Sequence, residues 1–184
     1  KGVPLTEQTP SFVQMRRTTV PAVGRFVMPV VKTAEGEWLS DSRHILDTLE
    51  ARHPEPASEP TGPRQRIASA LLEVYGDEWL ILAALHYRWA YPDNARFAVR
   101  EFARWGLPAL PRVLGAPLAS RVARRMASYR RLLGITPATA PALEALTAET
   151  IALLDTHLAH FDYLLGGRPC MGDFAMMGSL WAHL

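Results

Sequence analysis

The chain has 184 residues, of which 48% are hydrophobic and 21% are charged, and its formal net charge is +2. This composition supports a substantial core and excludes an intrinsically disordered chain. The small net charge gives no reason to expect a nucleic-acid partner. Cys170 is the only cysteine, which excludes an internal disulfide and favours a reducing, cytoplasmic location. No apolar run is long enough for a membrane span, and the first residues do not resemble a signal peptide.

The first part of the chain predicts a mixed α and β segment. "GVPLTEQTP" is typical of a strand, and "SFVQMRR" of a short helical turn. In "FVMPVVKTAEGEWL" a β-hairpin is predicted, because β-forming residues flank an "EGE" turn in which Gly36 can take a positive φ. Pro29 would remove a donor from the hairpin ladder, and a cis Met28–Pro29 bond that turns backbone groups outward would accommodate it.

A helix is predicted from about Ser42 to Arg52. Ser40, Asp41 and Ser42 are all good N-cap residues, and apolar residues recur after them at helical spacing. Free N–H groups and the positive end of the helix dipole at such a start suit a carboxylate or a phosphate. Two interpretations therefore stay open: an ordinary cap worth about 1 kcal/mol, or an anion-binding site.

A proline-rich linker divides the chain. "HPEPASEPTGP", residues 53–63, contains four prolines and a glycine and cannot continue as helix or strand. We predict an N-terminal domain over residues 1–53, a linker over 54–63, and an all-helical domain over 64–184.

Apolar periodicity predicts the helices after the linker. One long helix is expected over Arg64–Trp89, with an apolar second half that implies deep burial. A second helix has Leu118, Val122, Met126, Tyr129 and Leu133 as its predicted buried stripe. A third has the stripe Leu143, Leu146, Thr150, Leu153, Leu154, Leu158 and Phe161, and Gly166-Gly167 as its expected stop. The last helix is expected to open near Asp173 and to be still running at Leu184.

Three motifs occur in the order seen in one known family. "VMPVV" resembles the family strand that carries a cis-proline, "LSDSRHIL" its acidic-Ser-x-x-Ile motif, and "HFDYLLGGRPCMGDFAMMGSLWAHL" its C-terminal helix signature with Asp173 as the helix aspartate. Nearly the whole chain resembles the cytosolic glutathione S-transferase superfamily. The resemblance implies an α+β, thioredoxin-like N-terminal domain followed by an all-α C-terminal domain.

The resemblance also implies a glutathione site. Ser42 would hydrogen-bond the γ-glutamyl carboxylate through its hydroxyl and backbone N–H. Asp41 would pair with the γ-glutamyl ammonium or orient the turn. Met28, ahead of Pro29, would offer its backbone N–H and C=O to the cysteinyl part of the tripeptide. Glutathione would be a co-substrate, and no metal is expected.

The sequence departs from the family pattern in several places. His44 stands where a small residue is usual, as either a site contact or a partly exposed helix histidine. Cys170 replaces the capping Ser or Thr, and burial as a small hydrophobe is its expected role. The resemblance implies that the first strand, most of the first helix and the C-terminal end are missing. The catalytic Ser, Tyr or Cys therefore stays unknown.

In the family chemistry, the glutathione thiolate attacks an electrophile held in an adjacent apolar pocket. Tyr75, Trp79 and Tyr87 lie on the first helix after the linker, and their aromatic side chains suit a flat apolar electrophile. The alternative for each is ordinary core or inter-domain packing.

Three other features allow more than one interpretation. The basic stretch Arg121–Arg131 suits a membrane surface or nucleic acid, but a solvated face is the expected one. His157 and His160 have a metal-ligand spacing, although a core histidine is expected because no third ligand is evident. The segment 92–133 is longer than the usual family connection and is either a cover for the pocket or a dimer contact.

The sequence therefore predicts a cytoplasmic, homodimeric glutathione transferase that conjugates or reduces a small hydrophobic electrophile. The alternative is a non-catalytic interaction or scaffold module with the same fold. Neither nucleic acid nor a membrane span is expected.

Overall fold

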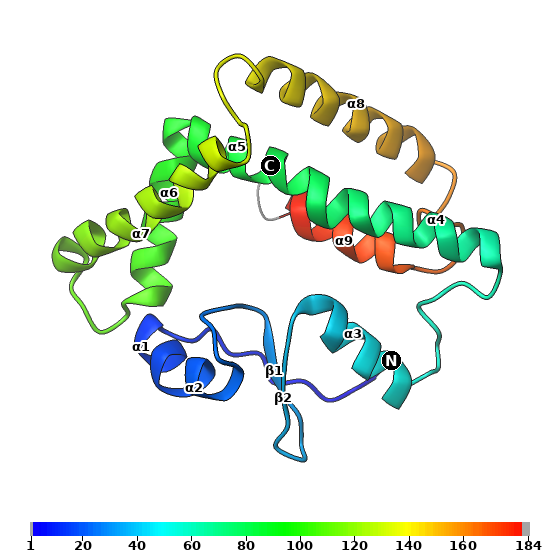
Figure 1. The fold of residues 1–184 in the computed structure, drawn as a ribbon, viewed down its shortest axis with the longest axis horizontal. Coiled ribbons are helices and arrows are strands. Elements are labelled where there is room, and N and C mark those ends of the chain that lie inside the picture. Colours follow the sequence, from blue (N-terminus) through cyan, green and yellow to red (C-terminus); the bar gives the residue numbers. More distant parts are fainter. Residues whose placement is uncertain (1, 182–184) are drawn as a thin grey trace. The chain divides into compact units, whose positions relative to one another are not determined.

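A computed structural model describes residues 2–181 of the chain. The described part is mostly helical, with one two-stranded sheet (Figure 1). The contacts group the chain into two compact units. Unit 1 contains the residues up to Ala57 together with Val99–Ser120, and unit 2 contains Ser58–Ala98 together with the residues from Arg121 onward. The first boundary falls inside the proline-rich linker, but residues 99–120 join the N-terminal unit although they lie within the predicted helical domain.

Unit 1 begins with an extended segment and a helical stretch. The helical stretch runs through α1 (Phe12–Gln14), the π-helix η1 (Met15–Thr19) and α2 (Val20–Val23), which extends the predicted turn by several residues. Ser11 and Gln14 form a reciprocal capping box at its start. The predicted strand before it is wrong, because residues 2–10 pair with no other segment and Pro4 and Pro10 have no N–H to donate.

The predicted hairpin and its following helix are confirmed. β1 (Val30–Lys32) pairs antiparallel with β2 (Trp38–Ser40), the Met28–Pro29 bond is cis, and Gly36 has a φ of 89° in the turn. The helix α3 occupies Ser42–Arg52, as expected. Leu39 of β2, Ile45 of α3 and Met15 of η1 are buried and supply the core of unit 1.

Two further helices, α6 (Pro92–Gly106) and α7 (Arg112–Leu132), fill the segment of uncertain role. The predicted buried stripe of α7 is wrong. Leu118, Val122, Tyr129 and Leu133 are exposed and Met126 is half-buried. The buried face consists instead of Gly115, Ala119 and Ala123, spaced four residues apart. Small side chains in this spacing allow a neighbouring element to pack closely, and a Cβ at Gly115 would lie 3.8 Å from Cβ of Ala103 in α6.

In unit 2 a continuous helical stretch spans residues 63–90. It comprises α4 (Pro63–Val74), the π-helix η2 (Tyr75–Trp79) and α5 (Leu80–Ala90). The predicted helix is therefore confirmed, but the π-helical segment within it was not predicted. The second half is buried as expected, including Leu80, Ala83 and Ala84. In the first half Ile67 and Leu71 are exposed, and the inward residue is Ser69.

The helices α8 (Ala140–Leu158) and α9 (Met171–Trp181) complete unit 2. α9 lies beside α4 (Figure 1). The predicted stop at Gly166-Gly167 is wrong, since α8 ends at Leu158 and Gly166, with a φ of 114°, belongs to a bridge with Tyr163. The start of the last helix is close to its expected place, whereas its predicted course to Leu184 passes outside the described residues.

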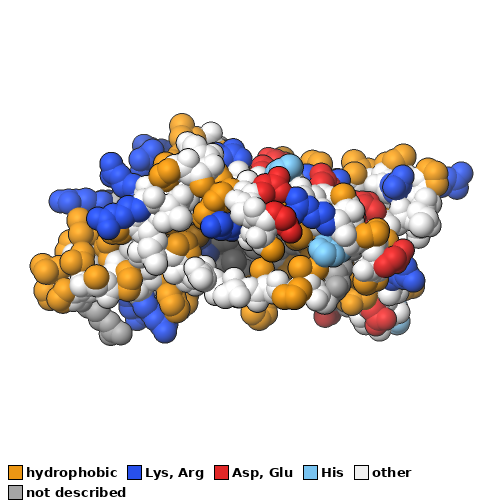
Figure 2. All heavy atoms as spheres, turned by 90° about the horizontal axis from the view of Figure 1, so that it is seen from below, with side chains coloured by type: hydrophobic (Ala, Val, Ile, Leu, Met, Phe, Trp, Pro, Cys, Tyr) orange, Lys and Arg blue, Asp and Glu red, His pale blue; other side chains and the backbone are white. Residues whose placement is uncertain are grey.

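Apolar side chains are common at the surface, and Figure 2 shows them in orange among charged groups on the face that it displays. Between residues 2 and 181, no helix combines the length and the apolar character that a membrane crossing requires.

Candidate functional site

The register of the hairpin brings the two predicted glutathione-binding pairs together. Val30 is the partner of Ser40 across the two strands. Met28 and Pro29 directly precede Val30, and Asp41 and Ser42 directly follow Ser40. Because antiparallel partners lie about 5 Å apart, both pairs sit at the same end of the hairpin, where α3 begins (Figure 1). All four residues are exposed and therefore accessible to a ligand.

Asp41 is the N-cap of α3 and has an unusual backbone conformation. Its φ of 78° makes it the only non-glycine residue with a positive φ among those described, and its ψ of 122° places it outside the left-handed helical region. Its Oδ1 accepts hydrogen bonds from the backbone N–H groups of Arg43 (3.1 Å) and His44 (3.4 Å). Ser42 is the first helical residue. The helix cap and the candidate serine thus belong to neighbouring residues.

The charges at this helix start suit a zwitterionic ligand. The exposed hydroxyl of Ser42 lies at the positive end of the dipole of an 11-residue helix, which favours a carboxylate. The Asp41 carboxylate beside it supplies the negative charge that an ammonium group needs. His44 is exposed on the first turn and matches the interpretation as an exposed helix histidine.

Tyr75 and Trp79, which were predicted to line an electrophile pocket, and Tyr87 on the same helical stretch make different contacts. The Tyr75 hydroxyl lies 2.7 Å from Oγ1 of Thr150 in α8. The Trp79 side chain is 49% exposed, and the ring of Tyr87 stacks on that of Tyr91 with centroids 5.7 Å apart.

A shallow apolar groove of about 390 Å³ lies elsewhere in unit 2, between α8 and α9, and none of the three aromatic residues lines it. Its lining residues are Ile151, Leu154, Asp155, Met177, Leu180 and Trp181.

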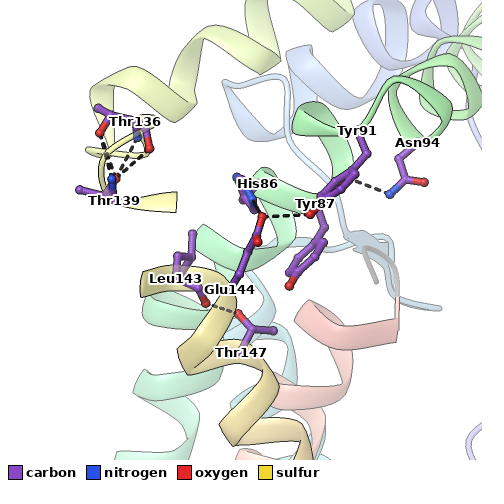
Figure 3. Close-up of polar contacts among 9 residues, drawn as sticks. All are labelled: His86, Tyr87, Tyr91, Asn94, Thr136, Thr139, Leu143, Glu144 and Thr147. Atoms are coloured by element: carbon purple, nitrogen blue, oxygen red, sulfur yellow. Dashed lines mark hydrogen bonds and ion pairs between the residues drawn. The ribbon is translucent and has the colours of Figure 1, made fainter. Parts of the chain in front are cut away.

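A polar cluster that the sequence did not predict joins α5 to α8 (Figure 3). Nε2 of His86 lies 2.6 Å from Oε1 of Glu144, and the same oxygen accepts a hydrogen bond of 2.9 Å from the Tyr91 hydroxyl. The His86 side chain is only 4% exposed, whereas the Glu144 carboxylate reaches the surface. Among the described residues, Nδ1 of His86 has no hydrogen-bond partner.

The electrostatics of this cluster follow from its hydrogen bonds. The bonds from His86 and then from Tyr91 lower the pKa of Glu144. The bond to this carboxylate, followed by burial, raises the pKa of Tyr91. Because His86 Nδ1 is buried, a dissolved substrate has no direct access to it, and the cluster acts as a polar attachment of α8 to α5. The only sign of this cluster in the sequence is an isolated histidine in an apolar helix, because its partner Glu144 lies 58 residues away.

The start of α9 confirms the predicted place of the helix aspartate. Asp173 accepts hydrogen bonds from the backbone N–H groups of Leu164 (2.9 Å) and Cys170 (2.8 Å). Cys170 is buried as expected, and burial raises the pKa of its thiol. Its reactivity is therefore suppressed.

His157 is half-buried, and its Nε2 lies 3.2 Å from the carbonyl oxygen of Tyr163. In the described range 2–181, no three His, Cys, Asp or Glu side chains are grouped so as to hold a metal ion.

In comparisons with known proteins, no family model, no curated protein and no solved structure matches the chain.

Proposed function

We propose that the chain is a glutathione-dependent transferase that conjugates or reduces a small hydrophobic electrophile in the cytoplasm, as a member of the cytosolic glutathione S-transferase superfamily. The observation that carries this proposal is the start of α3. An aspartate with a positive φ caps the helix, an exposed serine follows it, and both lie at the hairpin end that holds Met28 and Pro29.

The proposal assigns a ligand-binding role to each of these residues. The Ser42 hydroxyl and backbone N–H bind the γ-glutamyl carboxylate, where the helix dipole favours negative charge. The Asp41 carboxylate pairs with the γ-glutamyl ammonium, and the backbone of Met28 holds the cysteinyl part. The thiolate then attacks the electrophile. No residue of the chain is assigned to activating the thiol.

Calorimetric titration with glutathione tests the proposal. We expect saturable binding that Ser42→Ala weakens by about 1 kcal/mol or more, because a charge-assisted hydrogen bond is lost. Ser40→Ala, two residues earlier at the end of β2, is the matched control and should bind like the wild type. If the wild-type chain does not bind glutathione, the proposal fails, and Asp41 is then only a helix cap and Ser42 only an exposed first-turn residue.

The second candidate is a non-catalytic interaction module of the same fold. The groove between α8 and α9 favours it, because Ile151, Met177 and Trp181 expose apolar side chains there. This candidate predicts no glutathione binding, together with concentration-dependent self-association in analytical ultracentrifugation that Met177→Glu abolishes. Self-association without glutathione binding would favour the module over the enzyme.

A further inference from the structure

Charge is distributed very unevenly along the chain. Residues 92–133 contain nine arginines and only two acidic residues, Asp93 and Glu101, so this segment carries a formal charge of +7 and the rest of the chain carries −5. The helix α7 contains six of these arginines and no acidic residue. The near-neutral total therefore hides a strongly basic segment.

The part of α7 that belongs to unit 2 exposes its arginines beside large apolar side chains. We call this surface the basic α7 face; it consists of Arg121, Val122, Arg124, Arg125, Tyr129, Arg131, Leu132 and the adjacent Leu133. Leu132 is 79% exposed and Tyr129 is 40% exposed, whereas Ala123 on the opposite side is 4% exposed. The large apolar groups thus face outward and the small one inward.

Helical spacing separates the two kinds of side chain on the basic α7 face. Val122, Tyr129 and Leu133 follow one another by seven and four residues and so form one flank. Arg121, Arg124, Arg125 and Arg131 form the other flank, and Leu132 lies within that flank, between Arg121 and Arg125 around the helix. The exposed half of this helix is therefore itself amphipathic.

We propose that the basic α7 face binds peripherally to the surface of an anionic phospholipid bilayer. Arginines on one flank reach lipid phosphates, while the apolar flank enters the boundary between headgroups and acyl chains. Tyr129 is suited to this boundary because its ring is apolar and its hydroxyl is polar. The interaction is peripheral, since α7 carries too many charges to cross the bilayer.

The composition of the basic α7 face argues against two other occupants. A second copy of the same face would bring arginines against arginines, without a carboxylate from α7 to neutralise them. Nucleic acid would engage the arginines, but the aliphatic Val122, Leu132 and Leu133 offer no platform for stacked bases, and Tyr129 is the single aromatic residue. A lipid surface is the occupant that uses both flanks.

Vesicle flotation tests this proposal on the full chain. The probes are vesicles of phosphatidylcholine alone and vesicles of phosphatidylcholine and phosphatidylglycerol at a ratio of roughly 2:1. We expect binding to the anionic vesicles alone, at least tenfold weaker when Arg121, Arg124 and Arg125 are all replaced by Gln. Added salt should weaken it because the arginines are exposed. Leu132→Gln combined with Leu133→Gln should also weaken it, because apolar insertion is lost.

The matched control replaces the exposed Arg16, Arg17 and Arg25 of unit 1 by Gln, with the same change in net charge. It should bind anionic vesicles like the wild type. Equal losses in the control and the α7 variant would overturn the proposal, because net charge and not the basic α7 face would then govern binding. Unchanged binding of the Leu132/Leu133 variant, or displacement from anionic vesicles by a DNA duplex, would also overturn it.

Discussion

Helices α9 and α8 pack against the same helical stretch, residues 63–90, by different means. α9 approaches its backbone closely at two glycines: a Cβ at Gly76 would lie 2.6 Å from the carbonyl carbon of Ala175, and one at Gly172 would lie 2.5 Å from Cβ of Leu72. α8 instead uses hydrogen bonds, which join Thr150 to Tyr75 and Glu144 to His86. The first contact is intolerant of added volume, and the second is sensitive to protonation.

The largest expected effect is at the α9 contact. Gly76→Ala places a methyl group against the Ala175 backbone, which cannot rotate away, so the two helices must separate. We expect the free energy of unfolding to fall by about 3 kcal/mol, at the upper end of typical overpacking costs. Urea denaturation followed by circular dichroism measures it.

Gly178→Ala is the matched control for this substitution. Gly178 lies in the same helix, α9, and an added Cβ there would meet no atom within 4 Å. We expect a gain of about 0.5–1 kcal/mol from improved helix propensity. If the alanines at both positions had the same effect, the close approach at Gly76 would not explain the packing of α9.

An intermediate effect concerns the pH dependence of the α8 contact. The pKa of Glu144 is lowered in the folded chain, so its ionised form stabilises the fold above the unfolded pKa, and this contribution disappears as the pH falls through the lowered folded value. Glu144→Gln removes the titration. We therefore expect a smaller loss of stability between neutral pH and about pH 3 in the variant than in the wild type, measured by urea denaturation at each pH.

Glu149→Gln provides the comparison for this measurement. Glu149 is exposed on the same helix, and its replacement makes an identical change of charge. Its variant should keep the wild-type pH dependence. Identical pH profiles for Glu144→Gln and the wild type would show that the cluster does not couple α8 to pH.

The smallest effect is expected at the second polar contact of α8. Oγ1 of Thr150 already donates to the carbonyl oxygen of Leu146, so the Tyr75 hydroxyl is the donor in the bond between them. Tyr75→Phe should reduce the free energy of unfolding by about 1 kcal/mol. A double-mutant cycle with Thr150→Val measures the coupling energy between the two side chains. A coupling energy near zero would mean that this bond does not help to hold α8 in place.

Local chemistry made the hairpin and α3 predictable. The glycine turn, the proline ahead of Val30 and the acidic cap act within a few residues, and the structure has each of them where the sequence indicated. The same holds for Asp173, whose two bonds reach segments close to it in the chain. The candidate ligand site at the start of α3 was therefore assembled from short-range signals.

Packing over long sequence separations was not predictable in the same way. The periodicity of large apolar residues in α7 suggested a buried stripe, whereas Gly115 and Ala119 determine which face packs inward. The partner of His86 lies on another helix, and no local pattern connects the two. Small residues and isolated polar residues determine these contacts, but which contact they make depends on the neighbouring element.

The discontinuous course of unit 1 restricts how the gene can be divided. Because Val99–Ser120 belongs with the residues up to Ala57, the chain enters this unit twice. An expression fragment that stops in the linker would lack a part of its own fold, and one recombination event at the linker would exchange an incomplete module. The boundaries at residues 99 and 120 also fall inside α6 and α7, so separating the two units would cut two helices, and the units are expected to be inherited together.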